Sequence, residues 1–342
     1  MTIEKNLFGY TKDNKQVDAY TLIDDGMEVE IITFGAALRN IIIPTSCGPR
    51  DINFGFDEVS DYETKTGYLG AIIGRYANRI GKSEFTLDGK KYQMDDNDGE
   101  NSLHGGYNAF DQKVWDATVK PDGLYLSLHS PDMENGYPGN LDVEVKYSLK
   151  NRELTIEYTA KSDANTPLNL TNHTYFNLSG HNAGSIENHK IQIFADYITQ
   201  MDETLIPTGH KMDVTDTPFD FREPKLIGPG FESTHRQIIL GDGYDHNFVL
   251  SDLPYRDLTP AAVLECDGIK MTCLTTMPGI QFYSGNFLIG ETGKEDAKYE
   301  KRTGLCLETQ YWPDSVNKPE FPDSILKKGE TYHHITVYRF DY

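Results

Sequence analysis

The chain has 342 residues, enough to bury a large core, and length alone would suit two domains of about 100 to 200 residues each. Its 32 lysines and arginines stand against 53 aspartates and glutamates, which gives a formal charge of −21. This negative field repels phosphate backbones and anionic lipid, so we expect neither nucleic acid nor a membrane surface as a partner. A neutral ligand is compatible with it.

The sequence predicts a protein that neither crosses a membrane nor is exported. Aliphatic runs are short, as at Ile41 to Ile43, far below the roughly 20 residues of a membrane helix. The opening residues MTIEKNLFGY contain no apolar signal core. The four cysteines are scattered and form no CxxC motif, which favours reduced thiols. We therefore expect a cytoplasmic location.

Short alternating runs closed by Gly, Asp, Asn or Pro dominate the chain, and long helical periods are absent. This pattern predicts an all-β protein. Two segments rich in Gly and Pro, SPDMENGYPGN and EPKLIGPGF, resemble linkers, but candidate site residues lie on both sides of each. We therefore predict a single antiparallel domain over residues 1–342.

Residues 1–43 predict paired strands, because MEVEIITF is alternating or β-branched and FGAALRNIIIP ends an apolar run at Pro44. Residues 57–62 predict a single helical turn. The string GRYANRI then places Asn78 and Arg79 between apolar strands. An arginine there either forms a salt bridge at the surface or donates hydrogen bonds from its guanidinium group to the hydroxyl oxygens of a ligand.

The string DDNDGE at residues 95–100 resembles a calcium-binding loop, but the match fails. When Gly99 is aligned with the invariant glycine of that motif, Met94 falls at the first ligand position and Gly105 replaces the bidentate glutamate. A solvated turn is the better interpretation. His104 follows in NSLHGG, where two glycines allow a sharp turn. Taken alone, it looks like an ordinary loop histidine.

Residues 141–150 alternate apolar and polar side chains, and the alternation continues at 154–158 after Asn151. Such a pattern predicts a half-buried antiparallel strand pair.

The segment 171–178, TNHTYFNL, predicts a strand with polar groups on both faces. His173, Tyr175 and Asn177 would share a face with Thr171. A groove lined with imidazole, phenol and carboxamide groups suits a small polyhydroxylated molecule. His173 is therefore the first candidate for an acid or base.

Two later strings carry candidate ligands for hydroxyl groups. In GYDHNFVL, Asp245 and His246 would point to opposite faces, and the aspartate could accept from two neighbouring hydroxyls. A turn aspartate after Gly243 explains it equally well. In PGIQFYSGN, Gln281 can both donate and accept, and Phe282 could cover the apolar face of a sugar, although core packing is the default for such a ring.

The string GLCLETQYWPDS predicts a strand in which Leu305 and Leu307 face one way and Cys306, Glu308 and Gln310 face the other. Burying a glutamate raises its pKa towards the range that a general base needs. Glu308 is therefore the second candidate for proton transfer.

Motifs of other enzyme classes are missing: there is no GxGxxG of the nucleotide-binding type, no GxxxxGK[ST], no GxSxG and no HExxH. His104, His173 and a carboxylate could form a metal cluster, but no pair has the usual ligand spacing. We predict neither a metal nor a cofactor.

Six strings taken together resemble one known family. GRYANRI, NSLHGG, TNHTYFNL, YDHNF, PGIQFYSGN and ETQYWPDS, in this order, resemble the aldose 1-epimerases, the galactose mutarotases. FGAALRNIIIP and NFGFDEVSDY near the start and LKKGETY near the end extend the resemblance over nearly the whole chain. Each string is weak alone, whereas six in order are specific.

The resemblance implies a large, twisted antiparallel β-sandwich, the galactose mutarotase-like supersandwich, with the sugar in an open cleft. It implies interconversion of the α and β anomers of free aldohexoses, such as galactose or glucose, without a cofactor. By position, Glu308 matches the base for the C1 hydroxyl, His173 the acid for the ring oxygen and His104 a second histidine near it. The hydroxyl-binding positions and the aromatic wall of the family match Asn78, Arg79, Asp245, Gln281 and Phe282.

Three other functions remain open at this point. A glycoside hydrolase needs two carboxylates roughly 5 to 9.5 Å apart, for which Glu308 and Asp245 would serve, but the histidines would then lack a role. A non-catalytic sugar-binding domain would use the same cleft. An epimerase of hexose 6-phosphates would need an extra basic patch, which the acidic composition disfavours. A monomer and a homodimer are both compatible with the sequence.

Overall fold

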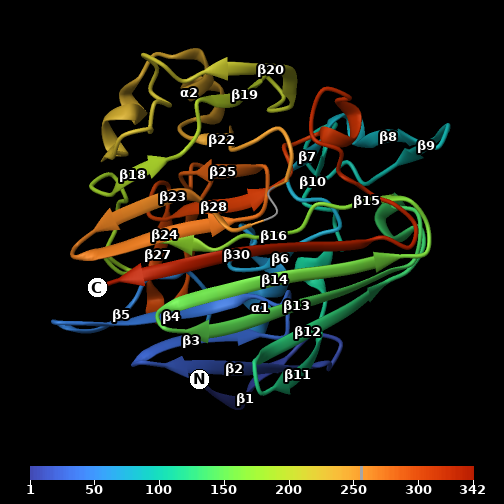
Figure 1. Cartoon of the computed structure of the whole chain (residues 1–342). Coiled ribbons are helices and arrows are strands. Elements are labelled where there is room, and N and C mark those ends of the chain that lie inside the picture. Colours follow the sequence, from blue (N-terminus) through green and yellow to red (C-terminus); the bar gives the residue numbers. More distant parts are fainter. Residues whose placement is uncertain (255–256) are drawn as a thin grey trace.

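The computed structural model describes residues 1–254 and 257–342 of the chain, and strands form most of it (Figure 1). The expected all-β class is confirmed. The α-helices in these residues are α1 (Val59–Thr64) and α2 (Arg236–Gly241). Neither helix is long and apolar enough to cross a membrane, nor is any other helix of the described residues.

A five-stranded antiparallel sheet forms the N-terminal part, at the bottom of Figure 1, with its strands in sequence order. Its strands are β1 (Thr2–Tyr10), β2 (Gln16–Asp24), β3 (Met27–Ile32), β4 (Leu38–Thr45) and β5 (Gly48–Asp51). The predicted pairing of residues 1–43 is thereby confirmed. The helical turn predicted over residues 57–62 exists as α1 but is shifted towards the C-terminus, because Val59 and Tyr62 anchor it in the core.

A nine-stranded sheet crosses the middle of the molecule in the order β11-β12-β13-β14-β30-β24-β23-β18-β21. Its strands are β11 (Asp116–Lys120), β12 (Gly123–Ser130), β13 (Leu141–Lys150), β14 (Glu153–Ser162), β18 (Lys190–Ile193), β21 (Lys225–Leu226), β23 (Thr259–Cys266), β24 (Ile269–Thr275) and β30 (Thr331–Asp341). The strand pair predicted over residues 141–158 is β13 with β14, and it extends further at its C-terminal end. Along both strands, apolar residues in the core alternate with exposed or half-buried polar residues, because successive side chains of a strand point to opposite faces.

A six-stranded sheet, in the order β17-β28-β25-β22-β19-β20, packs against the nine-stranded one. Its strands are β17 (Tyr175–Phe176), β19 (Tyr197–Met201), β20 (Pro207–Asp213), β22 (Asp245–Val249), β25 (Gly279–Tyr283) and β28 (Leu305–Gln310). Tyr338 of β30 donates a hydrogen bond to the carbonyl oxygen of Leu307 at 3.1 Å, and its ring lies 5.0 Å from that of Phe176. The two sheets therefore form a sandwich with a shared apolar interior.

Five short two-stranded pairs complete the described fold, and two of them contribute residues to the cavity described below. They are β6 (Ile72–Ile73) with β16 (Thr171–Asn172), β7 (Arg79–Ile80) with β10 (Ser102–Leu103), β8 (Glu84–Leu87) with β9 (Lys90–Gln93), β15 (Thr166–Pro167) with β29 (Ile325–Leu326), and β26 (Ile289–Thr292) with β27 (Lys298–Glu300).

The prediction of one continuous strand over TNHTYFNL is wrong. The segment pairs with β6 through Thr171 and Asn172 and then joins β28 through Tyr175 and Phe176. The segment passes from one neighbouring strand to another, so His173 lies in the crossing between two short strands. The alternation of faces survives at His173 and Tyr175, which both line the cavity described below.

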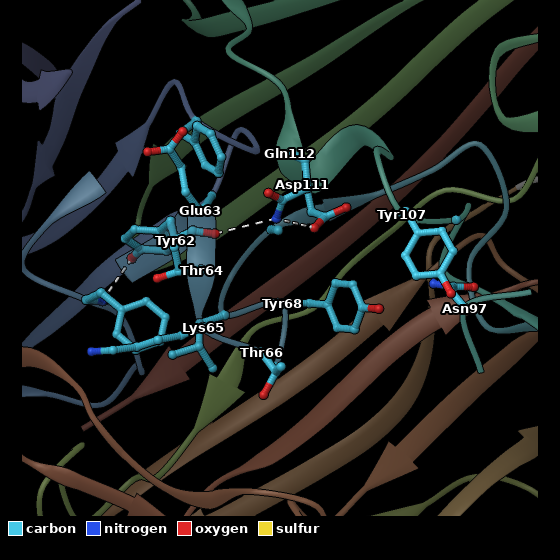
Figure 2. A pocket seen from close by; sticks show the side chains of 17 residues that line it. Tyr62, Glu63, Thr64, Lys65, Thr66, Tyr68, Asn97, Tyr107, Asp111 and Gln112 are labelled. Carbon is cyan, nitrogen blue, oxygen red and sulfur yellow. Dashed lines mark hydrogen bonds between the residues drawn. The ribbon is translucent and has the colours of Figure 1, made fainter. Parts of the chain in front are cut away.

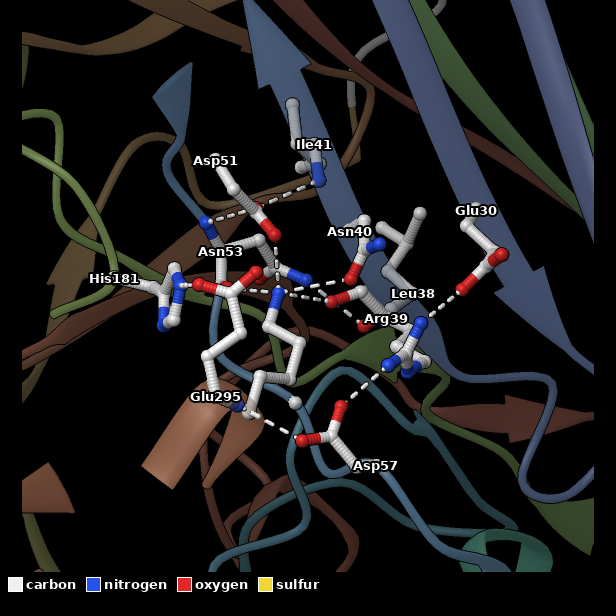
Figure 3. Close-up of polar contacts among 12 residues, drawn as sticks. Glu30, Leu38, Arg39, Asn40, Ile41, Asp51, Asn53, Asp57, His181 and Glu295 are labelled. Atoms are coloured by element: carbon white, nitrogen blue, oxygen red, sulfur yellow. Dashed lines mark hydrogen bonds and ion pairs between the residues drawn. The ribbon is translucent and has the colours of Figure 1, made fainter. Parts of the chain in front are cut away.

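Lys294, which lies between β26 and β27, ties the N-terminal sheet to this hairpin. Figure 3 labels its partners Arg39, Asn40, Asp51 and Asn53. Its buried Nζ atom donates to Asp51 Oδ2 at 2.5 Å and to Asn40 Oδ1 at 2.9 Å. The carbonyl oxygens of Arg39 and Asn53 also accept from it, at 2.8 and 2.7 Å. Burial lowers the pKa of Lys294, and the Asp51 carboxylate opposes this shift. A buried ammonium group needs such partners, so these contacts hold the hairpin in place.

Candidate active site

A cavity of about 200 Å³ lies on the six-stranded sheet. It is lined by residues of β22, β25 and β28 and by His173 from the crossing. Six of the residues singled out from the sequence line it, although they come from distant parts of the chain. They are Asn78, Arg79, His104, His173, Asp245 and Glu308. The fold thus brings both candidate proton carriers and most of the candidate hydroxyl ligands to one place.

His173 and Glu308 face each other in this cavity, with His173 Nε2 3.8 Å from Glu308 Oε2. Both side chains are buried. Burial lowers the pKa of His173 to about 4, and a hydrogen bond with its own backbone opposes this shift. Burial also raises the pKa of Glu308 well above its ordinary value; the Asp245 carboxylate adds to the shift and Arg79 opposes it. Both shifts favour the uncharged forms of the pair, a glutamic acid and a neutral imidazole, over the ion pair.

The tautomer of His104 follows from its contacts. The backbone N–H of Asn78 donates to His104 Nδ1 at 3.1 Å, so Nδ1 must accept and the proton of the neutral ring must lie on Nε2. The ring lies 5.2 Å from that of His173, edge to face. Burial lowers the pKa of His104 well below its ordinary value, with further contributions from His173 and Arg79. His104 is therefore a neutral hydrogen-bond donor.

Arg79 and Asp245 form the charged side of the cavity. Arg79 Nη1 lies 3.6 Å from Asp245 Oδ2, and Arg79 Nε donates to Asp98 Oδ2 at 2.8 Å. Burial acts to lower the pKa of Arg79, but its two carboxylate partners outweigh that effect and raise it. Burial raises the pKa of Asp245, and Arg79 opposes this shift. The surface salt bridge considered for Arg79 is thereby replaced by a buried one, and the turn at residues 95–100 supplies one of its partners.

Gln281 and Phe282 do not line the cavity in the way the sequence predicts. Gln281 Nε2 donates to Asp245 Oδ1 at 2.7 Å, so it lies behind the aspartate and orients it. The structure corrects the aromatic wall at Phe282, because this ring is fully buried in the core and stacks on Tyr244 at 4.9 Å. Side chains alternate along β25, so Tyr283 is the aromatic residue of this strand that faces the cavity.

Further aromatic and apolar residues complete the lining. Tyr175, which was predicted to share the face of His173, lines the cavity. Tyr283 was missed, although it follows Gln281 by two residues and face alternation could have identified it. Tyr68 follows Gly67, and its ring lies 4.7 Å from that of His104. The exposed Phe287 and Ile289 form part of the rim. No local signal marked Tyr68 or the rim residues, because long-range packing brings them to the site.

A second cavity of about 380 Å³ adjoins the first and shares Thr66, Gly67 and Tyr68 with it (Figure 2). It contains Asp111, whose pKa burial raises to about 6, and Gln112, whose amide donates to Asp111 Oδ2 at 2.8 Å. The side chain of Tyr68 therefore lines both cavities.

The cavity that contains Glu308 has donor atoms for a metal ion as well as for proton transfer. The nearest ligand atoms of His104, His173 and Glu308 all lie within 4.8 Å of one another. The absence of a metal therefore stays a prediction, which chelation tests. Among the described residues, Arg79 is the one lysine or arginine that lines this cavity, and it is already paired with two carboxylates. A phosphorylated sugar would find no free cation there.

Comparison with known proteins identifies the family. The model of the aldose 1-epimerase family matches residues 18–339. The galactose mutarotase of Bos taurus is 43% identical over 326 residues, which cover 95% of this chain and 94% of that protein. The aldose 1-epimerase of Escherichia coli K12 is 39% identical over 323 residues, 92% of each protein.

Solved structures agree with this assignment. The galactose 1-epimerase of Lactobacillus acidophilus superimposes with a TM-score of 0.86 at 29% identity, over 99% of this chain and 98% of that one. An aldose epimerase homologue from C. elegans also has a TM-score of 0.86 at 29% identity, over 94% of this chain and 98% of that one. The chain therefore belongs to the aldose 1-epimerase family.

Proposed function

We propose that this chain interconverts the α and β anomers of free aldohexoses, with Glu308 as the base on the C1 hydroxyl and His173 as the acid on the ring oxygen. Membership of the family carries the coarser activity, the interconversion of aldose anomers. The specific roles rest on one observation, the 3.8 Å distance between His173 Nε2 and Glu308 Oε2. The C1 hydroxyl and the ring oxygen of a pyranose are bonded to the same carbon, so an acid and a base that serve both must reach one small region of the cavity, and the observed distance meets this condition.

The reaction needs two proton transfers and one bond rotation. Glu308 takes the proton of the C1 hydroxyl while His173 gives its proton to the ring oxygen, and the bond from C1 to the ring oxygen breaks. The aldehyde turns about the C1–C2 bond. The hydroxyl that formed from the ring oxygen then attacks the other face of the aldehyde, and both proton transfers are reversed. Each transfer contributes about 10² to 10⁴ in rate.

The proton count of the pair agrees with this scheme. A protonated Glu308 with a neutral His173 holds as many protons as an ionised Glu308 with an imidazolium. Burial favours the neutral arrangement. A bound sugar supplies a hydroxyl donor for the carboxylate and an ether acceptor for the imidazolium, which stabilise the charged arrangement. The neutral His104 can donate from Nε2 to a sugar oxygen without competing for the catalytic proton.

Arg79 and Asp245 are the proposed ligands of the remaining hydroxyls, with Asn78 at their side. An ionised aspartate accepts from two neighbouring hydroxyls, and Gln281 holds its other oxygen in place. The rings of Tyr68, Tyr175 and Tyr283 offer apolar faces to the C–H groups of the sugar.

Polarimetry on freshly dissolved α-D-galactose and α-D-glucose tests this function. We expect faster mutarotation, unchanged by a chelator, and a loss of at least about 10²-fold in kcat for Glu308→Gln. His173→Asn should lose kcat in the same way, whereas Asp245→Ala should mainly raise KM. Glu153→Gln serves as the control and should keep full activity, because the Glu153 carboxylate pairs with Arg339 and does not line the cavity.

Undiminished turnover in Glu308→Gln would refute the assigned roles, and inhibition by a chelator would indicate a metal at the histidines. Release of reducing sugar from oligosaccharides would favour a glycoside hydrolase. Sugar binding with no acceleration of anomer exchange would leave only a binding protein.

A further inference from the structure

Two carboxylates lie beside the guanidinium group of Arg79, and only one of them forms a hydrogen bond with it. Arg79 Nε donates to Asp98 Oδ2 at 2.8 Å, whereas Arg79 Nη1 lies 3.6 Å from Asp245 Oδ2. The second distance is longer than an N–H···O hydrogen bond, which is at most about 3.2 Å long. Among the described residues, the contact with Asp98 is therefore the one hydrogen bond of this guanidinium group.

The separation of Arg79 from Asp245 leaves polar groups of both residues available to a ligand. A guanidinium group has five N–H groups, so those on Nη1 and Nη2 remain once Nε is bound. Asp245 Oδ1 accepts from Gln281, while Asp245 Oδ2 accepts no hydrogen bond within the described residues. Arg79 and Asp245 both line the cavity. Donors and acceptors thus lie side by side, an arrangement that the hydroxyls of a sugar can bridge.

The turn that carries Asp98 is itself held firmly. The backbone N–H and carbonyl groups of Asp98 bond to those of Asn101, both at 3.0 Å. The side chain of Asn97 bonds to the N–H and carbonyl groups of Leu103 at 2.8 and 2.9 Å. Leu103 pairs with Arg79 between β7 and β10. The turn and the arginine are therefore fixed to the same strand pair.

The other charged neighbours of Arg79 attract its side chain towards the cavity. The carboxylates of Asp245 and Glu308 both line the cavity and both favour the charged form of Arg79. A charge-assisted N–H···O bond is about 2.7 to 2.9 Å long, so a shift of less than about 1 Å would join Arg79 to Asp245. Such a pair would occupy the groups that hydroxyls need.

We propose that Asp98 is a positioning residue of the sugar site, which holds Arg79 away from Asp245 so that both side chains bind hydroxyls of the aldose. The inference rests on the proposed function, in which these two residues are hydroxyl ligands. Asp98 is not among the residues that line the cavity, so it acts through Arg79 and not on the sugar. Its removal should weaken sugar binding and leave the proton transfers at His173 and Glu308 unchanged.

Sugar binding by Asp98→Ala tests this role. We expect KM and the dissociation constant for D-galactose to rise about tenfold, near the lower limit for one lost hydrogen bond to a charged group. The value of kcat should change less than about twofold. Calorimetric titration with an equilibrated anomer mixture measures the dissociation constant, because anomer exchange then releases no net heat. Asp96→Ala is the control, since it removes the same charge from an exposed position of the same turn and should leave both constants unchanged.

A crystal structure of Asp98→Ala gives a second measurement, which needs no activity. We expect Arg79 to move into hydrogen-bond contact with Asp245. An unchanged separation would overturn the proposal, and so would wild-type affinity in Asp98→Ala. An equal loss of affinity in Asp96→Ala would overturn it too, because the charge of the turn alone would then explain the effect. Thermal melting of both variants controls for loss of fold.

A double variant shows whether Asp98 acts by opposing the attraction of Asp245. Asp245→Asn removes the charge that attracts Arg79, so adding Asp98→Ala to it should raise the dissociation constant by less than about threefold. An undiminished effect would contradict the proposal. A wild type without mutarotase activity would instead refute the proposed function, and the crystal structure of Asp98→Ala would still decide this inference.

Discussion

Two proton-carrying side chains meet at 3.8 Å in the cavity, and burial shifts the pKa of each away from its ordinary value. His173 resists taking a proton and Glu308 resists losing one. The pair therefore holds one proton between them at pH values between the lowered pKa of His173 and the raised pKa of Glu308. Groups so close titrate together, so their observed pKa values belong to the pair.

We expect a bell-shaped dependence of kcat/KM on pH, whose acid and alkaline limbs reflect the pKa shifts of His173 and Glu308. As pH falls, the pair takes up a second proton on His173, whose pKa of about 4 places this limb below the ordinary value of 6.5. As pH rises, the pair loses its one proton from Glu308, and the raised pKa of Glu308 places that limb above the ordinary value of 4.5. Initial rates by polarimetry, at sugar concentrations below KM, measure both limbs.

An acid limb centred at or above 6.5 would contradict the pKa shift of His173. Glu308→Gln should also remove the alkaline limb from the residual activity, because the proton lost there belongs to Glu308.

At the scale of secondary-structure elements, the crossing at residues 171–176 determines the position of His173, the proposed acid. Gly70 anchors this crossing, because its N–H group donates to the carbonyl oxygen of His173 at 2.9 Å. Its own carbonyl oxygen accepts from Asn172 Nδ2 at 2.6 Å and from the N–H group of Leu38 at 2.9 Å. The glycine has a φ of +68°, and an added Cβ would lie 1.9 Å from the carbonyl oxygen of Leu38.

Gly70→Ala should therefore destabilise the fold and displace His173. We expect the free energy of unfolding to fall by about 3 kcal/mol or more, from the strained φ and the backbone clash together. Gly99→Ala is the matched control, because Gly99 has a φ of +65° with nothing within 4 Å of an added Cβ. That control should lose about 1 kcal/mol. Urea unfolding followed by circular dichroism gives both values, and equal losses would show that the clash is relieved elsewhere.

At the scale of the whole molecule, one apolar cluster extends from Tyr20 in the N-terminal sheet to Phe340 in β30. Residues of all three large sheets contribute to it, and both Gly- and Pro-rich segments lie between its members. We propose that the described parts of the chain unfold as a single domain. Thermal unfolding should give one transition, at the same temperature by circular dichroism and by tyrosine fluorescence. Two separated transitions would instead indicate two domains.

Acid should destabilise the molecule through its buried histidines. Burial lowers the pKa of His189 to about 4, so the unfolded chain binds more protons between the ordinary value of 6.5 and that value. The contribution of neutral His189 to the free energy of unfolding is thus fully present above pH 6.5 and is lost as the pH falls towards 4.

When the pH is lowered through this window, the free energy of unfolding of His189→Gln should fall by up to about 3 kcal/mol less than that of the wild type. The exposed His210→Gln is the control and should follow the wild type. Urea unfolding at several pH values measures the difference, and parallel curves for His189→Gln and wild type would contradict the assignment.

Local rules explain why so much of this site was predictable. Side chains alternate along a strand with a period of two residues, which correctly separated Asp245 from His246 and Glu308 from Leu307. The two glycines of NSLHGG correctly indicated the sharp turn at His104. The same rule, applied one residue further, would have replaced Phe282 by Tyr283.

The sequence by itself determined the β architecture and which residue types were available for acid–base chemistry, because both follow from short-range patterns of polarity. Only the tertiary structure decided that TNHTYFNL crosses between two strands and that Asp98 pairs with Arg79. It also placed Cys306 against His173, across a sequence separation of 133 residues. Strand partners and distances of this kind depend on contacts between remote segments, and no local pattern records them.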